Sequence, residues 1–446
     1  MIKKLINNLQ TQINSNTQLS EVLGKGFVAF VFKIGGVLLF FLFNMAVSRY
    51  VNTEAWGIFS LFYPVVNIVS VIGIFGCDVA MIRIMAENFT SGKREKAKSL
   101  YHQILKLVVG LSLLLSLALF LFSPLLAHFY NNELLLNAFR LGALCILPMA
   151  IISIHGEGLR GMKKIQEFSY LQQGTQFGLA LLIFICFMGI RIPHVNWVII
   201  AFVVAIWITA LWGVFLFQKH SGFRSIIAQD ATNNHMMSLL QMVFPMFLSG
   251  FLFIVMTWTD ILILGHYVSK DYVGIYRTGL QIAGVSNMAL FAVNTIVAPK
   301  FAELYTKNDK EGLANVVRNS SKLMFVISFP FMVLIFLFPK FILGIFGKDY
   351  VINEALYTVL ILTVSQLFNV VFGSVLTLLN MTGRQKIVQN IVIIATLINF
   401  ALCCICIPRW GIIGAAIANA VNMLCWNLIA AIYIKKHYNF WTIAFL

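Results

Sequence analysis

Charged residues are scarce in this sequence, and acidic residues are the scarcest of them. Asp, Glu, Lys and Arg together make up 11% of the 446 residues, whereas a typical soluble chain has about 25%. Hydrophobic residues make up 60%, which excludes an ordinary soluble domain and indicates a polytopic membrane protein. The 32 basic and 16 acidic residues leave a net charge of +16. Because the basic residues lie in short loops between apolar runs, we attribute this charge to membrane topology and expect no nucleic-acid partner.

Sequence motifs of enzymes and of metal sites are missing as well. The chain has no Walker A loop, no Gly-x-Ser-x-Gly and no His-Glu-x-x-His. Cys403, Cys404 and Cys406 form a cluster, but no histidine or carboxylate lies close to them in the sequence. We therefore expect free, buried thiols rather than metal ligands. The sequence predicts no catalytic residue, no metal site and no bound cofactor.

The apolar runs are long enough to cross a membrane many times. A bilayer core about 30 Å thick needs roughly 20 apolar residues per helix. The first twenty residues are too polar for the core of a secretory signal peptide, so the first run is expected to act as an uncleaved anchor. Twelve membrane helices are predicted. They cover residues 26–50, 55–86, 101–129, 134–157, 167–190, 195–218, 238–267, 272–299, 320–346, 354–382, 386–408 and 410–434.

Lys and Arg are distributed unevenly between the two sets of loops. The two termini and the loops that follow even-numbered helices hold 21 of them, whereas the opposite loops hold five. By the positive-inside rule, both termini are expected in the cytosol. The opposite loops are also short, which argues against a receptor or an enzyme with a folded domain outside the membrane.

The two halves of the chain resemble each other in sequence. VNTEAWG after the first helix matches VSKDYVG after the seventh, which pairs Gly57 with Gly274, 217 residues apart. LFSP at 121–124 matches LFP at 337–339 in the same order. Six helices per half return the chain to the same side, so the halves are parallel repeats, as in transporters with a site between two lobes. The predicted domains are a cytosolic N-terminal segment 1–24, a six-helix bundle 25–218, a cytosolic linker 219–237, a second six-helix bundle 238–436 and a C-terminal tail 437–446.

Several segments of the chain resemble O-antigen-type polysaccharide flippases. SRYVNTEAWGIFSL (48–61) and IGIFGCDVAMIRIMAE (72–87) are similar to the first two helices of that family. LNMTGRQKIVQN (379–390) and PRWGIIGAAIANAV (408–421) continue the similarity near the other end of the chain. The family belongs to the multidrug/oligosaccharidyl-lipid/polysaccharide exporter (MOP) superfamily. The resemblance implies an all-α polytopic fold, with two six-helix bundles around a central cavity that opens to one side at a time.

The resemblance also implies a function. The family flips an undecaprenyl-pyrophosphate-linked oligosaccharide across the bacterial cytoplasmic (inner) membrane by alternating access, for O-antigen and other surface polysaccharide. The implied partners are this lipid-linked oligosaccharide, membrane lipid, a polysaccharide polymerase and a chain-length regulator, and a proton or sodium gradient is a candidate energy source. Two alternatives stay open. A related cation-coupled multidrug antiporter would need an acidic cavity, and a membrane polymerase or glycosyltransferase would need acidic clusters or large outer loops.

Four cations inside the predicted helices are candidates for binding the pyrophosphate. They are Lys33, Arg49, Arg83 and Arg277. Arginine suits bidentate phosphate contacts, and lysine offers a point charge. Three of them have a simpler alternative role: Lys33 could extend to the membrane interface, Arg49 could anchor its helix there, and Arg83 could contact lipid phosphates.

Two carboxylates and several amides complete the predicted site. Similar depths in the membrane predict that Lys33 pairs with Asp78 and that Asp260 pairs with Arg277, because an ion pair lowers the cost of burying both charges. Asp260 and Asp78 are also candidates for carrying a coupling ion. The candidate polar cavity residues are Asn44, Asn67, Asn287, Asn294 and Gln366. Such amides alternatively hydrogen-bond across helices as packing contacts.

Overall fold

The structure is a computed structural model that describes residues 17–89, 92–171, 173–189, 194–223 and 236–443. Within these ranges the chain is almost entirely α-helical, and no β-strand occurs in them. Eight of the described helices are long and apolar enough to cross a membrane alone, and shorter apolar helices accompany them. The expected all-α, polytopic fold is confirmed.

The first half of the chain runs from α2 to α9. Its elements are α2 (Thr17–Tyr50), α3 (Thr53–Ile74), α4 (Cys77–Ile84), the π-helical turn Met85–Phe89, α5 (Arg94–Phe129), α6 (Leu134–Gly161), α7 (Ile165–Tyr170), α8 (Gln173–Met188) and α9 (Val195–Ser221). Two helices predicted as continuous are broken, one between α3 and α4 and one between α7 and α8.

The break after α3 has a local cause that hydropathy does not reveal. Phe75 and Gly76 both adopt left-handed backbone, with φ of 52° and 73°. Gly76 lies against α10 so closely that a Cβ there would stand 2.6 Å from the carbonyl oxygen of Val243. Neither residue interrupts the apolar run, so the sequence predicts one continuous helix through this position.

The second half runs from α10 to α17. Its elements are α10 (Met236–Tyr267), α11 (Lys270–Gly284), α12 (Asn287–Thr306), α13 (Lys310–Leu337), α14 (Pro339–Gly344), the 3₁₀ turn Lys348–Tyr350, α15 (Asn353–Phe372), α16 (Val375–Met381) and α17 (Gln385–Tyr438). The predicted helix over 320–346 instead ends at Leu337, and Pro339 begins α14. The last two predicted helices form α17, which kinks at Gly411 where φ is 54°.

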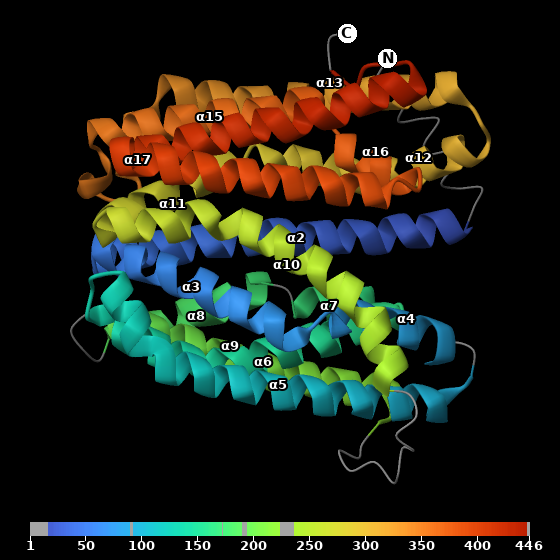
Figure 1. The fold of residues 1–446 in the computed structure, drawn as a ribbon, viewed down its shortest axis with the longest axis horizontal. Helices are drawn as coiled ribbons and strands as arrows, with labels where there is room; N and C mark the ends of the chain where they lie inside the picture. Colours follow the sequence, from blue (N-terminus) through green and yellow to red (C-terminus); the bar gives the residue numbers. More distant parts are fainter. Residues whose placement is uncertain (1–16, 90–91, 172, 190–193, 224–235, 444–446) are drawn as a thin grey trace.

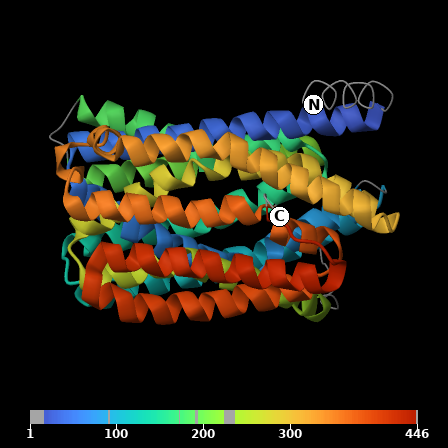
Figure 2. The same cartoon turned by 90° about the horizontal axis from the view of Figure 1, so that it is seen from above.

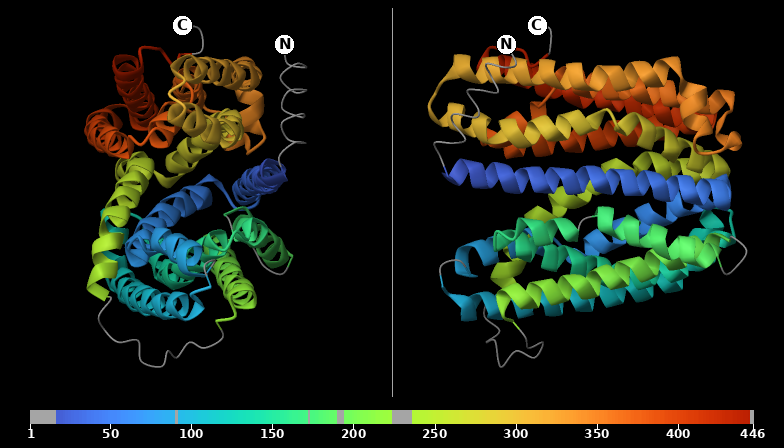
Figure 3. Two further views of the ribbon diagram at one scale, coloured as in Figure 1. Left: turned by 90° about the vertical axis from the view of Figure 1, so that its right-hand side faces the viewer. Right: turned by 180° about the vertical axis from the view of Figure 1, so that it is seen from behind.

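The helices run roughly parallel to one long axis, in two bundles (Figures 1 and 2). The start of α2 and the end of α17 lie toward one end of this axis, which we call the terminal face; the opposite end is the distal face. Seen along the axis, α2 lies between the bundles, and α10 runs from the second half across to the first (Figure 3). α10 packs on α17 of its own half and on α3 and α4 of the other half.

The core of the first half is rich in aromatic residues from several helices. Trp56 stacks on Phe59 with ring centroids 5.5 Å apart, and Phe59 also contacts Phe43 and Phe202 edge to face. In contrast, α5 and α13, the third membrane helices of the two halves, carry rows of exposed Leu and Phe. These rows are the surfaces expected to face lipid.

The two glycines paired by the repeat also meet in space. A Cβ added to Gly57 of α3 would stand 1.7 Å from the carbonyl oxygen of Lys270, and one on Gly274 of α11 would stand 2.7 Å from that of Thr53. Since Thr53 is the repeat equivalent of Lys270, the contact is reciprocal. Glycine at both positions lets the backbones of α3 and α11 approach this closely where the halves meet.

Candidate functional site

The two halves are joined by hydrogen bonds near the distal face. The hydroxyls of Ser48 and Tyr350 lie 2.6 Å apart, and Thr53 Oγ1 donates to Asp271 Oδ1 at 2.5 Å. Lys270 adds a third link between the halves. We call these five residues the distal gate.

Lys270 is a buried cation within the distal gate. Its side chain is 6% exposed, and its Nζ donates to the carbonyl oxygens of Tyr130, at 2.7 Å, and Gly265, at 2.8 Å. Tyr130 belongs to the first half and Gly265 to the second, so one ammonium joins both. A buried charge is tolerated here because two carbonyl dipoles replace its hydration.

Arg49 also lies at the distal gate. Its side chain is exposed, and Nε donates to the carbonyl oxygen of Ile345 at 2.7 Å. This contact joins the end of α2 to the segment after α14. The structure thus places Arg49 at the outer edge of the contact between the halves, away from Arg277.

Within the described part of the chain, hydrogen bonds between the halves all lie toward the distal face. Nearer the terminal face the halves meet through aromatic side chains, as where Phe75 stacks on Phe247 with centroids 4.8 Å apart. Hydrogen bonds need defined geometry, whereas stacked rings can slide. The described hydrogen bonds between the halves thus hold them together on the distal side.

Arg277 is the predicted cation that lies between the halves. It is seven residues from Lys270, about 10 Å from the distal end of α11. Its guanidinium lies 4.7 Å from the Trp258 ring centroid and 5.5 Å from that of Phe40, which belongs to the other half. Cation–π contacts of this kind stabilise a desolvated guanidinium by about 2 kcal/mol.

A narrow pocket with mainly aromatic walls surrounds Arg277. Its lining residues are Phe40, Trp56, Phe59, Ser60, Tyr63, Pro64, Trp258 and Arg277. They come from α2 and α3 of the first half and from α10 and α11 of the second. In this state the pocket is too narrow for a water molecule. Separation of α3 from α11 would widen it and expose the guanidinium.

Asp260 lies near Arg277, but Tyr276 is its hydrogen-bond partner. The Asp260 side chain is 3% exposed, and Oδ2 accepts a hydrogen bond from the Tyr276 hydroxyl at 2.6 Å. Oδ1 accepts from the backbone N–H of Ile261 at 2.8 Å. Among the described residues, no salt bridge joins Asp260 to Arg277. Both carboxylate oxygens thus accept hydrogen bonds within the second half, whereas the Arg277 guanidinium faces aromatic rings of both halves.

The remaining charged candidates lie toward the terminal face. Asp78 is half-buried on α4, and its Oδ1 accepts from the N–H of Val79 at 2.9 Å. Arg83 is exposed and forms an ion pair with Glu87 at 2.7 Å. Lys33 is part of α2, but its side chain lies outside the described residues. Its pairing with Asp78 stays a prediction.

Three of the five amide candidates are engaged in contacts between helices. Asn44 is fully buried, and its Nδ2 donates across the halves to Thr278 Oγ1 at 3.1 Å and to Gln281 Oε1 at 2.6 Å. Asn287 Nδ2 donates to Gln366 Oε1 at 2.6 Å, which joins α12 to α15 within the second half. Hydrogen bonds of this kind commonly hold helices together in membrane proteins.

The other two amides retain unused hydrogen-bonding capacity. The side-chain carbonyl oxygens of Asn67 on α3 and Asn294 on α12 are buried, and neither has a hydrogen-bond partner in the described part of the chain. A buried unsatisfied acceptor costs about 1–3 kcal/mol, a cost that a hydrogen-bond donor reaching either oxygen would remove.

Sequence reasoning missed the five residues of the distal gate and the aromatic residues around Arg277 and Asp260. Trp258 and Tyr276 appear in the sequence as ordinary apolar helix residues, and Lys270 as a charge in a short loop. For Lys270 a signal was present, because the repeat pairs it with Thr53, the first residue of a helix. For the two aromatics the sequence contains no comparable signal.

Comparisons with known proteins identify the family. Residues 22–305 match the polysaccharide biosynthesis protein family, and residues 245–405 match the MatE family. The chain is 23% identical over 417 residues to the probable low-salt glycan biosynthesis flippase Agl15 of Haloferax volcanii, covering 91% of this chain and 82% of that protein.

Solved structures show the same fold. An inward-facing multidrug resistance MATE family transporter of the MOP superfamily has a TM-score of 0.75 at 15% identity, covering 90% of this chain and 94% of that one. The lipid II flippase MurJ in an inward closed conformation has a TM-score of 0.72 at 16% identity, covering 93% and 87%. The resemblance inferred from the sequence is confirmed. The chain belongs to the polysaccharide biosynthesis protein family, a family of polysaccharide flippases in the MOP superfamily, and is a transporter rather than an enzyme.

Proposed function

We propose that this protein flips a lipid-linked oligosaccharide, carried on undecaprenyl pyrophosphate, across the cytoplasmic membrane of a bacterium by alternating access. The product would supply the assembly of O-antigen or another surface polysaccharide, with a polymerase and a chain-length regulator as later partners. The family match and the glycan flippase among the relatives support a lipid-linked glycan as the substrate class.

The observation that carries the proposal is the charge between the halves. Arg277 lies in the contact between the halves, and the nearby Asp260 carboxylate is occupied by Tyr276. The Arg277 guanidinium can donate charge-assisted hydrogen bonds to an anion such as pyrophosphate, whereas a cationic drug offers no such acceptor. This charge favours a flippase for an anionic lipid-linked substrate over an antiporter for cationic drugs.

We further propose that the structure corresponds to the inward-facing state. The excess of Lys and Arg on the terminal side supports a cytosolic location for that face. The hydrogen-bonded distal gate would then close the outer side, and the two solved structures described above are in inward conformations. In the cycle, separation of α3 from α11 opens the gate and widens the pocket at Arg277, so that the pyrophosphate meets this cation on its way out.

The proposal is tested by substitution of Arg277. We expect Arg277→Ala to lower export of surface polysaccharide at least tenfold at normal membrane abundance, because one charge-assisted contact is worth about 1.5–3 kcal/mol. Arg277→Lys should restore part of the activity, since it keeps the charge and loses the bidentate geometry. Arg409→Ala is the matched control, because Arg409 is an exposed arginine outside the pocket.

Two results would contradict the proposal. Normal export by abundant Arg277→Ala protein would show that the cation does not contact the substrate. Loss of cationic-drug efflux in Asp78→Asn, with polysaccharide export unchanged in every variant, would instead identify a drug antiporter.

A further inference from the structure

A groove on the outside of the first half contains a cation that the transport site does not use. The groove lies between α5 and α6 and has a volume of about 410 Å³, within the range of about 300–1,000 Å³ typical of small-molecule sites. Its lining residues are Leu113, Ser116, Leu117, Phe120, Arg140, Leu141, Ala143 and Leu144. Leu113, Leu117 and Leu144 are exposed on the surface that we expect to face lipid.

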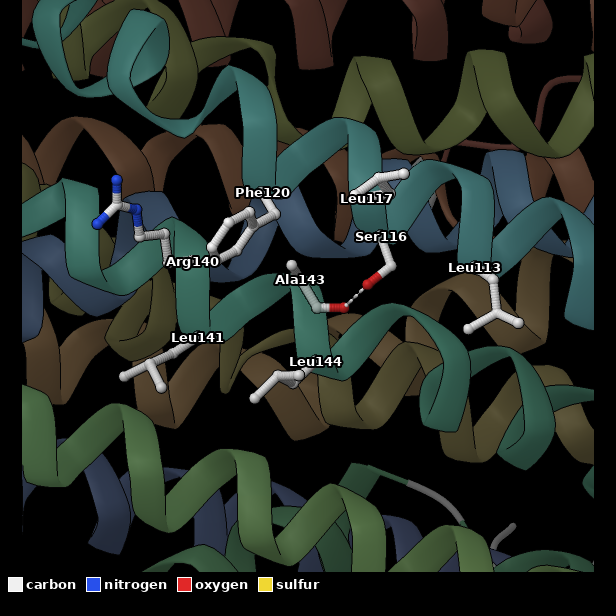
Figure 4. A pocket seen from close by; sticks show the side chains of 8 residues that line it. All are labelled: Leu113, Ser116, Leu117, Phe120, Arg140, Leu141, Ala143 and Leu144. Carbon is white, nitrogen blue, oxygen red and sulfur yellow. Dashed lines mark hydrogen bonds between the residues drawn. The ribbon is translucent and has the colours of Figure 1, made fainter.

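The groove is apolar along its length and positive at one end. Arg140 and Phe120 lie at one end and Leu113 at the other (Figure 4). The one hydroxyl in the lining, that of Ser116, donates to the carbonyl oxygen of Ala143 at 2.5 Å. Arg140 therefore supplies the hydrogen-bond donors still available to a ligand, next to a wall of hydrocarbon side chains.

The packing of the helices does not explain why α6 carries an arginine at position 140. It is the one charged residue between positions 134 and 156 of α6, and it lies about 9 Å from the distal end of this helix. Its guanidinium lies 5.6 Å from the Phe120 ring centroid, and within the described residues it forms no salt bridge. The corresponding helix of the second half, α15, contains no Lys or Arg. The repeat fold therefore forms without a cation at this position.

We propose that this groove binds one anionic phospholipid of the distal leaflet. Its phosphate would contact the Arg140 guanidinium, and one acyl chain would lie along the groove past Leu117 and Leu144 toward Leu113. The charge is complementary, because an intramembrane arginine without a carboxylate partner is stabilised by an anion. The groove is formed by α5 and α6, whereas the contact between the halves is formed by α2, α3, α10 and α11, so the occupant is a resident membrane lipid rather than the transported substrate.

The test is native mass spectrometry of the full-length protein titrated with phosphatidylglycerol or phosphatidylcholine. We expect one phosphatidylglycerol to be retained by the unmodified protein. Arg140→Gln should bind it about tenfold more weakly, as expected for loss of a charge-assisted hydrogen bond. Leu144→Trp, which fills the groove and keeps the charge, should weaken binding comparably. Arg409→Gln and Leu121→Trp are matched controls on exposed positions outside the groove and should bind as the unmodified protein does.

Three results would overturn the proposal. One is unchanged phosphatidylglycerol binding by both Arg140→Gln and Leu144→Trp. Another is equal weakening by Arg409→Gln, which would indicate a general effect of charge. The third is equal retention of phosphatidylcholine, which would exclude selection of an anionic lipid. If Arg140→Gln fails to fold, Leu144→Trp still decides, because it leaves the arginine in place.

Discussion

Substitution of Gly57 by alanine should open the distal gate. The added Cβ would stand 1.7 Å from the backbone oxygen of Lys270, and real Cβ contacts are essentially never shorter than 3.0 Å. A backbone oxygen cannot rotate away as a side chain can, so α3 and α11 would have to separate by about 1.3 Å. At Gly274 the nearest atom to an added Cβ is 2.7 Å away, so the required separation is about 0.3 Å. A Cβ added at Gly110 would have no atom within 4 Å, apart from those of its own stretch of helix.

These distances set the expected magnitudes. Forced overpacking costs about 1–3 kcal/mol, and about 1.4 kcal/mol corresponds to a factor of ten. Gly57→Ala should therefore shift the gate toward its open state by about 5-fold to 150-fold. Gly274→Ala should shift it less, and Gly110→Ala not at all. The helix propensity gained by alanine, roughly 1 kcal/mol, is the same with the gate open or closed and cancels.

The gate can be monitored by cysteine labelling. Ser48 is 7% exposed, and its hydroxyl is hydrogen-bonded to that of Tyr350 in the closed gate. Ser48→Cys, in a background without the seven native cysteines, would be treated with a membrane-impermeant maleimide from the distal side. We expect the labelling rate to rise in the order Gly110→Ala, Gly274→Ala, Gly57→Ala. Equal rates in Gly110→Ala and Gly57→Ala would refute the steric argument.

Further substitutions test the other buried contacts. Lys270→Met should raise the Ser48→Cys labelling rate about tenfold, because the two buried carbonyl oxygens lose the ammonium that donates a hydrogen bond to each. An unchanged rate would show that Lys270 does not hold the gate closed. Tyr276→Phe should lower the melting temperature with export unchanged, since the Asp260 carboxylate loses a 2.6 Å hydrogen bond worth about 1.5–3 kcal/mol. Asp260→Asn should likewise reduce stability and keep export. Lost export by well-folded Asp260→Asn protein would instead identify Asp260 as a carrier of the coupling ion.

The sequence by itself determined the membrane fold and its twofold repeat. Apolar run length follows from bilayer thickness, and each run is a local property of the chain. The repeat paired Gly57 with Gly274, and the structure shows that the two glycines meet at the contact between the halves. Sequence also identified Arg277 as a cation inside a predicted membrane helix, because charge among apolar residues is visible without a structure.

Tertiary structure alone decided which polar groups meet. Ser48 and Tyr350 are 302 positions apart, and Lys270 and Tyr130 are 140 apart. Hydropathy and helical periodicity report only on neighbours within a few turns, so they contain no information about partners at such separations. Asp260 lies near Arg277 and interacts with it electrostatically, yet its side-chain hydrogen bond comes from the Tyr276 hydroxyl. Depth fixes the level of a charge in the membrane, whereas the rotation and packing of the helices decide which donor faces it.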